Sequence, residues 1–421
     1  MFKKTTLKNG TRLILTPLKD TKAITLLVLV ATGSKYESKE VNGISHLLEH
    51  MVFKGTKNRP QTSDLAKELD RIGGFFNAFT GKEYMGFWVK VDSKHLNIAL
   101  DIVSDMLFNS LFKEGEIEKE KKVIFEEINM IKDSPQGHVL NLWEGLLYGD
   151  QPSGWLISGE KETVAKISRN NILNYLKNQF VVKNIVISLA GNFGEAKMKK
   201  EIEKFFGAFK KEQPLGKKPT KEAQSKPQSL IGFKETDQSH LCLGVRTFDL
   251  FSPQRHALAV LSGVLGGGMS SRLFIKVREK QSLAYYIRTF PELYTDSGYL
   301  VTHAGVANNR IEEALKIILG EYKDLSTKKV TKEELSKVKE HIKSQINLEL
   351  ETSDSWASFC GGQEILRNEI QSPEQECREI DKITQDDILK LAKEIFRPEN
   401  LNLALIGPFK EKDKFQNLLN L

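Results

Sequence analysis

The sequence predicts an α+β protein of two homologous domains, each with its own sheet and layer of helices. Three observations support this class: the length of the chain, an internal repeat, and a regular alternation of β-rich and helical segments. At 421 residues the chain exceeds one ordinary domain, for which about 100 to 200 residues are typical. Hydrophobic residues make up 40% and charged residues 28%, as in soluble globular proteins that bury a core.

The internal repeat can be counted. Residues 166–193 and 382–409 align without a gap at a constant offset of 216, and ten of the 28 positions are identical. Unrelated sequences would match at only about two such positions, so the repeat indicates a duplication. The repeated unit reads as a helix, a turn at Asn184 or Asn400, a strand and a second helix.

The other elements follow the same alternation. In the first half, an Asn-Gly turn precedes the strand TRLILTP, and AITLLVLVA reads as a buried strand. Helices are predicted at 45–53, 63–72, 93–108 and 114–131, and in the second half at 257–265, 312–325 and 333–350. A polar, proline- and lysine-rich stretch at 210–228 has no apolar period and is typical of a linker. We therefore expect domains at 1–209 and 229–421.

Charge and cysteine usage exclude several classes. The 62 basic and 55 acidic residues are intermixed, which indicates a solvated surface rather than a nucleic-acid footprint. The three cysteines are far apart and form neither a disulfide framework nor a CxxC pair, so they are expected to be reduced. The N-terminus has no apolar h-region or cleavage site, and the longest apolar run, at 24–31, is shorter than the ~20 residues that cross a bilayer. A cytoplasmic location without membrane contact is expected.

The segment GISHLLEHMVFKGT carries the chemistry. In a helix, His46 and His50 lie one turn apart and can hold a single ion, while Glu49 lies on the same side without having to be a ligand. HxxEH is the reversed form of the HExxH zinc motif, the inverzincin pattern. A site of this kind keeps one position for water, and Glu49 could take its proton as general base. The alternative is an amphipathic helix whose histidines happen to lie near a glutamate.

A third ligand must be an oxygen or nitrogen donor, because the first half contains no cysteine. The helix EGEIEKEKKVIFEEINMIKD offers several glutamates. Glu120 and Glu127 are two turns apart on one face, where Val123 and Ile124 suggest burial. Spacing alone does not separate Glu127 from Glu126, and all of these glutamates could instead be solvated.

The full chain resembles the M16 family of zinc peptidases, specifically the subfamily of mitochondrial processing peptidase and its bacterial relatives. The resemblance rests on GISHLLEHMVFKGT, GGFFNAFTGKEY, EKEKKVIFEEI and GGGMSSRLFIKVREKQSLAYYI. It implies a LuxS/MPP-like metallohydrolase fold with a mainly antiparallel sheet covered by helices in each domain. It also implies a zinc metalloendopeptidase with one Zn²⁺ per chain, acting on extended or unfolded peptides inside a closed chamber.

The resemblance assigns roles to further residues. It makes Glu127 the third zinc ligand, with 76 residues between it and His50. It implies that Glu120 does not bind zinc itself but supports a residue that does. Asn77, Ala78 and Phe79 match the strand that takes an extended substrate by β-augmentation. The matching positions of the second half are Arg278 and Tyr285, which the resemblance implies hold substrate or stabilise the oxyanion.

The second half should lack a metal site. The offset of 216 places Ser262, Gly266 and Lys343 opposite His46, His50 and Glu127. These three residues do not form a set of zinc ligands. Family members of this length pair two chains, so a homodimer is expected. A heterodimer with an inactive relative is left open.

A second hypothesis for the function is a non-catalytic assembly or chaperone-type subunit. Phosphate binding at GGGMSS is disfavoured because no lysine follows the glycines as in a Walker loop.

Overall fold

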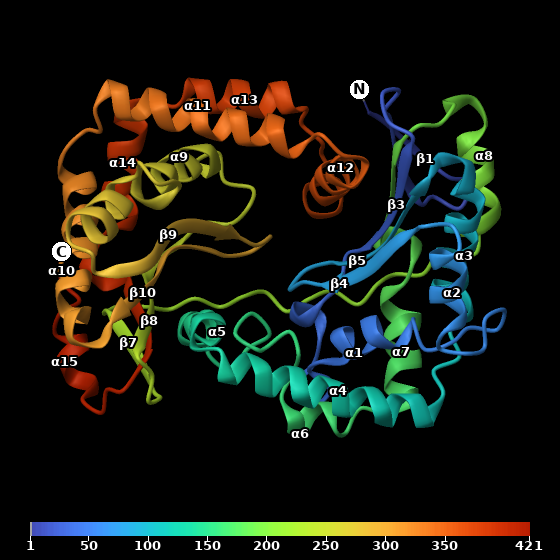
Figure 1. Cartoon of the computed structure of the whole chain (residues 1–421), viewed down its shortest axis with the longest axis horizontal. Helices are drawn as coiled ribbons and strands as arrows, with labels where there is room; N and C mark the ends of the chain where they lie inside the picture. Colours follow the sequence, from blue (N-terminus) through green and yellow to red (C-terminus); the bar gives the residue numbers. More distant parts are fainter. Residues whose placement is uncertain (1) are drawn as a thin grey trace. The chain divides into compact units, whose positions relative to one another are not determined.

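The computed structural model describes residues 2–421 and divides the chain into two compact units, each an α+β assembly of one sheet and its helices (Figure 1). The predicted fold class is confirmed. The first unit is formed by the chain up to Ile128, by Trp155–Lys218 and by Asn347–Ser372. The second is formed by Asn129–Gly154, Pro219–Ile346 and Pro373–Leu421.

A six-stranded sheet forms the centre of the first unit. Its spatial order is β1 (Lys3–Thr6), β2 (Arg12–Pro17), β6 (Ile185–Gly191), β3 (Ala23–Val30), β5 (Met85–Asp92) and β4 (Phe75–Thr80). All neighbours are antiparallel except β2 and β6. The strands β3 and β6 are buried along almost their whole length, as their continuous apolar sequences predict. Strand β4 is an edge of the sheet, a position that matters for the site.

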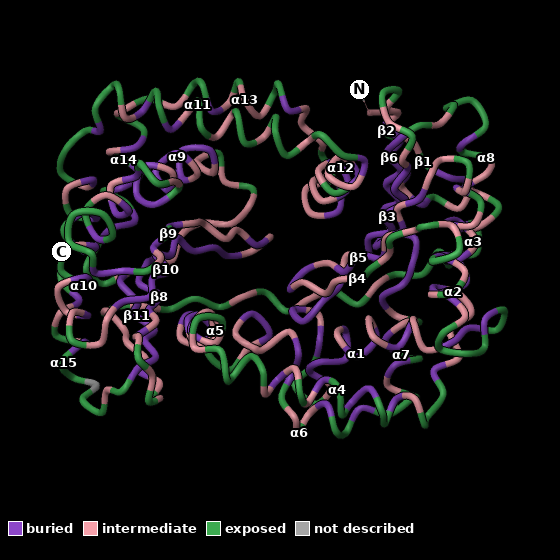
Figure 2. The backbone as a smooth tube through the Cα atoms, viewed as in Figure 1, coloured by how far each residue is buried: buried purple, intermediate pink, exposed green. Residues whose placement is uncertain are grey.

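Seven helices of the first half and one of the second belong to this unit or run along it. They are α1 (Ile44–Met51), α2 (Asp64–Asp70), α3 (Leu96–Asn109), α4 (Glu114–Asp133), α6 (Lys161–Val164), α7 (Arg169–Gln179), α8 (Glu195–Phe206) and α12 (Ser353–Arg367). Each helix expected from the apolar period of the first half is present, with ends that differ by a few residues. The purple tube segments of Figure 2 follow the buried strands and the inner faces of these helices.

The second unit repeats this design with five strands. Their order is β7 (Gln228–Phe233), β11 (Leu401–Gly407), β8 (Gln238–Thr247), β10 (Gly298–Ala307) and β9 (Ala284–Leu293). Its helices are α5 (Pro135–Tyr148), α9 (Arg255–Gly266), α10 (Ile311–Thr327), α11 (Lys332–Glu349), α13 (Pro373–Lys382), α14 (Gln385–Ile395) and α15 (Lys412–Gln416). Again one pair, β7 and β11, is parallel and the others are antiparallel.

The offset found in the sequence holds for whole elements. Strands β2 and β6 and helix α7 become β7, β11 and α14 when 216 is added to both of their bounds. Local contacts repeat as well. The side chains of Asn184 and Asn400 both donate to the carbonyl five residues earlier, at 3.0 and 3.2 Å. Helices α7 and α14 both begin with a capping box, which satisfies backbone N–H groups at a helix start.

The compact units are not the two sequence halves, because two helices are exchanged. Helix α5 comes from the first half, yet Val139, Trp143 and Leu147 pack on the sheet of the second unit. Helix α12 comes from the second half, yet Ala357 and Cys360 pack on β3 and β6 of the first unit. Each sheet therefore has one face covered by helices of its own half and the other by a helix of the other half. The predicted domains at 1–209 and 229–421 describe the repeats, not the compact units.

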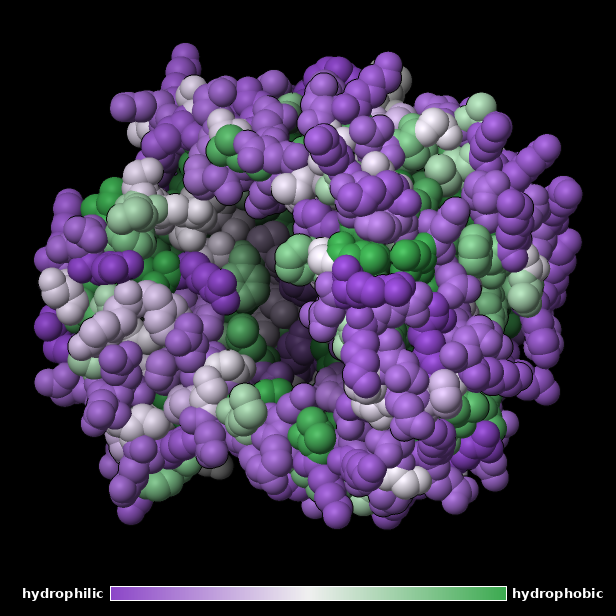
Figure 3. Space-filling view, turned by 45° about the vertical axis from the view of Figure 1, so that its right-hand side comes forward, coloured by the Kyte–Doolittle hydropathy of each residue, from purple (hydrophilic) through white to green (hydrophobic). Residues whose placement is uncertain are grey.

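Figure 3 shows a face dominated by hydrophilic side chains, with hydrophobic ones in separate patches. Cys242, Cys360 and Cys377 are free thiols. Among the helices that the structure describes, none has the length and apolar character needed to span a bilayer.

We expect replacement of Trp143 by alanine to destabilise the second unit. Its ring is fully buried and packs edge to face on Tyr299, so removal leaves a large cavity and costs about 3–5 kcal/mol. Urea unfolding followed by circular dichroism measures the loss. The matched control is Trp356→Ala on the exchanged helix α12, whose ring is only partly buried. Equal losses in the two variants would contradict the proposed importance of the α5 contact.

Candidate metal centre

Helix α1 places both histidines beside the core. Ile44, Leu47, Leu48 and Met51 recur at the spacing of one helical face and are buried, so the helix is fixed along that side. His46 and His50 lie on the neighbouring, partly exposed side, with ring centroids 4.8 Å apart.

A buried carboxylate fixes the start of this helix. Glu37 accepts hydrogen bonds from the backbone N–H groups of Gly43 and Ser45, at 2.8 and 2.9 Å, and from the Asn42 side chain at 2.8 Å. These are groups that a helix start leaves unsatisfied, and its dipole favours a negative charge there. Burial raises the pKa of Glu37, and the hydrogen bonds oppose that rise. The Ser45 hydroxyl contacts Tyr175 of α7 at 2.7 Å, which ties α1 to a second helix.

Helix α4 supplies the carboxylate. Glu127 Oε2 lies 3.6 Å from His46 Nε2 and 3.6 Å from His50 Nε2, and one ligand atom from each of the three residues lies within 4.8 Å of the others. Ligands about 2.0–2.1 Å from a tetrahedral zinc lie about 3.3 Å from one another, so the donor set fits this metal. Burial lowers the pKa of His46 to about 4, and a neighbouring His50 adds to this. A neutral imidazole has the free lone pair that a metal ligand needs.

The burial of α4 explains why Glu127 and not Glu126 faces the histidines. Ile124 and Ile128 are buried in the core of the first unit, and Glu127 lies beside them on the partly buried side of the helix. Glu126 points to the exposed side. The expectation that Val123 is buried was wrong, since it is 44% exposed. The side chains of Ile117, Ile124 and Ile128 form the buried stripe, and Val123 lies off it.

Glu120 lies behind His50. Its Oε2 is 3.1 Å from His50 Nδ1, and its Oε1 is 2.8 Å from the ammonium group of Lys54. With Nδ1–H donating to this carboxylate, the His50 tautomer leaves Nε2 free to bind a metal. Sequence reasoning missed Lys54, although its position four residues after His50 puts it on the same helical side.

Glu49 is held by the edge strand. The hydroxyl of Thr80, at the end of β4, donates to Glu49 Oε2 at 2.6 Å. Burial raises the pKa of Glu49, the Thr80 hydrogen bond opposes this, and the nearby Glu127 adds to the rise. A carboxyl group with a raised pKa is suited to exchange protons near neutral pH. Sequence reasoning also missed Thr80, because only the packing of α1 against β4 brings Thr80 and Glu49 together.

The predicted substrate strand lies next to this base. Asn77, Ala78 and Phe79 belong to β4, which pairs with β5 on one side and is the last strand of the sheet on the other. Asn77 is exposed, whereas Ala78 is buried. A strand edge offers backbone N–H and C=O groups to an added strand.

Arg278 and Tyr285 belong to the second unit, so the metal group of the first unit forms without them. Arg278 lies in the π-helical segment Phe274–Lys280, with its guanidinium 4.8 Å from the ring centroid of Phe274. Tyr285 follows at the start of β9 and is 68% exposed.

The corresponding place in the second unit is closed by packing. Helix α9 takes the position of α1, and the Ser262 hydroxyl donates to the carbonyl of Thr289 at 2.9 Å. A Cβ atom at Gly266 would lie 2.5 Å from the Thr289 nitrogen, so no larger side chain fits. Lys343 forms ion pairs with Glu340 and Asp381. In the described chain, a group of three possible metal ligands occurs only at His46, His50 and Glu127.

We expect Glu120→Gln to lower zinc affinity by about 10- to 100-fold, as is usual when the partner of a metal-binding histidine is changed. Lys54→Met should lower it less, because it acts on His50 through Glu120. Competition with a chromophoric chelator measures both. Glu118→Gln, an exposed change on the same helix, is the control and should bind zinc like wild type. Unchanged affinity in Glu120→Gln would refute the supporting role.

Comparison with known proteins agrees with this geometry. Residues 13–155 match the family model described as insulinase, peptidase family M16, and residues 166–342 match the peptidase M16 inactive domain. The chain is 37% identical to the uncharacterized zinc protease YmxG of Bacillus subtilis, over 97% of this chain and 98% of that protein. It is 34% identical to an uncharacterized zinc protease of Rickettsia felis, over 96% of each.

Solved structures share the fold. A protease from Helicobacter pylori superposes with a TM-score of 0.90 at 24% identity, covering 97% of this chain and 99% of that one. A chain of complex III₂ from Candida albicans superposes with a TM-score of 0.86 at 19% identity, covering all of both chains. The family models and the extended identity to relatives lead to one conclusion: the chain belongs to the M16 peptidase family.

Proposed function

We propose that this protein is a zinc-dependent endopeptidase that hydrolyses extended or unfolded peptides, with His46, His50 and Glu127 as metal ligands and Glu49 as general base. The observation that carries the proposal is the convergence of two imidazoles and one carboxylate from α1 and α4, with a second carboxylate beside them that is not needed as a ligand. Two histidines and a glutamate are a donor set of catalytic zinc sites.

The residues of the site have different roles in the proposed hydrolysis. Bound zinc supplies Lewis acidity, which activates water and polarises a peptide carbonyl. Glu49 takes the proton of the attacking water and passes it to the leaving amine, and Thr80 holds its carboxylate in place. Glu120 and Lys54 fix the tautomer of His50. Each of these functions depends on a contact within the first unit.

Substrate binding is proposed at β4. An extended peptide pairs with the exposed edge of this strand along Asn77, Ala78 and Phe79, next to Glu49. Arg278 and Tyr285 are proposed to hold the substrate or stabilise the oxyanion. As the family resemblance implies, two chains form the chamber as a homodimer, in the manner of the processing-peptidase subfamily, and the cytoplasm is the proposed location.

A non-catalytic assembly subunit is the second candidate. A chain of complex III₂ shares the fold, but at 19% identity this likeness concerns the fold alone and does not extend to a role. The presence of a complete ligand set together with a hydrogen-bonded Glu49 favours the peptidase, since a scaffold has no need of either.

Glu49→Gln should keep zinc and lose peptide cleavage by about 10²- to 10⁴-fold, because the base can no longer take a proton. A quenched fluorescent peptide measures cleavage, and elemental analysis measures bound zinc. Glu126→Gln is the matched control, one residue from the third ligand, and should retain both. Equal cleavage by wild type and Glu49→Gln would reject the peptidase proposal.

Thr80→Val should shift the acidic limb of the pH–rate profile to higher pH. The Thr80 hydrogen bond lowers the pKa of Glu49, so its removal raises that pKa, and the base is then deprotonated only at higher pH. Thr80→Ser keeps the hydroxyl and should leave the profile in place. The dependence of kcat/KM on pH for the three proteins measures the effect, and a profile that does not move in Thr80→Val would contradict it.

A further inference from the structure

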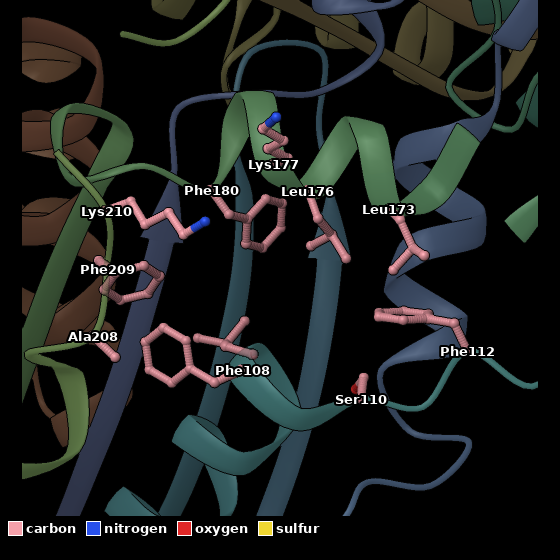
Figure 4. A pocket seen from close by; sticks show the side chains of 11 residues that line it. Phe108, Ser110, Phe112, Leu173, Leu176, Lys177, Phe180, Ala208, Phe209 and Lys210 are labelled. Carbon is pink, nitrogen blue, oxygen red and sulfur yellow. The ribbon is translucent and has the colours of Figure 1, made fainter. Parts of the chain in front are cut away.

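A second concave site lies in the first unit, apart from the metal centre. It is a pocket of about 250 Å³ between the end of α3, the helix α7 and the segment that follows α8 (Figure 4). None of its lining residues belongs to the metal group or contacts Glu49. Neither the family comparisons nor the proposed peptidase reaction gives it a role.

The walls of the pocket are apolar and built from rings. Phe108, Phe180 and Phe209 surround one end, and the ring centroids of Phe108 and Phe209 are 4.6 Å apart. Leu173 and Phe112 form the other end. The four phenylalanines belong to the main core of the unit or pack against it, and the pocket opens to the surface at Leu173, Lys177 and Lys210.

The backbone around the pocket is fixed. The N–H of Val182 donates to the carbonyl of Lys210 at 2.9 Å, which holds the segment after α8 against the end of α7. Phe112 has a φ of 47°, an unfavourable conformation for a bulky residue. The guanidinium of Arg169 donates to its carbonyl at 2.9 Å and stabilises this turn. A pocket with such walls is largely formed before any ligand binds.

Two lysines provide the charge. Lys177 and Lys210 line the pocket, and the ammonium group of Lys210 points across it toward Phe180. Within residues 2–421 neither lysine forms an ion pair, and no acidic side chain lines the pocket. The remaining polar side chain, Ser110, already donates to the carbonyl of Met106 at 2.7 Å. The site therefore combines apolar walls with positive charge at one end.

We propose that this pocket binds a small amphipathic carboxylate, with its apolar part between the phenylalanines and its carboxylate beside Lys177 and Lys210. A volume of about 250 Å³ holds about eight groups of the size of a water molecule, each with a share of about 30 Å³. That is the size of a medium-chain fatty acid or of one aromatic residue at a peptide C-terminus. Both carry the same chemistry, an apolar group that ends in a carboxylate.

The zinc-loaded protein is titrated calorimetrically with octanoate and with N-acetylphenylalanine, each compared with its amide. Saturable binding of at least one acid, about five- to twentyfold tighter than its amide, is expected, because each exposed lysine contributes a modest charge interaction. The acid that binds more tightly shows whether the source is a free fatty acid or a peptide end. In saturation-transfer NMR, the apolar protons of the bound acid are expected to receive magnetisation from the protein more strongly than protons near its carboxylate.

Three variants test the pocket itself. Lys177→Ala/Lys210→Ala should abolish the preference for acid over amide, and Ala208→Trp at the pocket wall should block both. Lys197→Ala/Lys200→Ala, which removes the same charge from the exposed side of α8, should bind like wild type. No saturable binding of either acid would overturn the proposal. Equal binding of acids and amides would do so as well, since the carboxylate would then contribute nothing to recognition.

Discussion

The metal centre depends on the packing of helices α1 and α4 in one hydrophobic core. Leu47, Leu48 and Met51 of α1 and Ile124 and Ile128 of α4 are all buried in the core cluster of the first unit. Burial of these side chains fixes the rotation of each helix about its axis, because a turn in either would expose apolar surface. Once both rotations are fixed, His46 and His50 on α1 and Glu127 on α4 face one another. The imidazoles and the carboxylate meet as a consequence of core packing.

The duplicated half shows what the same fold does without that chemistry. Strand positions, capping boxes and the asparagine turns repeat at an offset of 216 residues. At the place of the histidines, Gly266 allows α9 to approach Thr289 closely, and a larger side chain would collide with the backbone. The two units therefore share one backbone plan and differ at a few side chains. In the first unit, the donor atoms of His46, His50 and Glu127 are left free. In the second unit, α9 packs closely at the corresponding place.

The exchange of α5 and α12 makes the two halves of the sequence depend on each other. Gly361 on α12 has no side chain, and a Cβ atom there would lie 2.8 Å from Leu29 of the first sheet, so the helix can approach closely. Trp143 on α5 fills the corresponding face of the second sheet. Neither sheet is covered on both faces by residues of its own half. A chain cut at the predicted linker would leave apolar surface exposed on both pieces.

The sequence alone determined the class of fold, the duplication and the residues with metal-binding character. Periodicity and spacing are local properties, so they were sufficient for the helices, the buried strands and the placement of His46, Glu49 and His50 on one helix. Spacing could not separate Glu126 from Glu127. It placed Lys54 on the side of His50 without indicating its role, and it gave no sign of Thr80 or the exchanged helices. Those depend on contacts between residues far apart in the chain: the contacts of α1 with α4 and β4, and the packing of α5 and α12 on the two sheets.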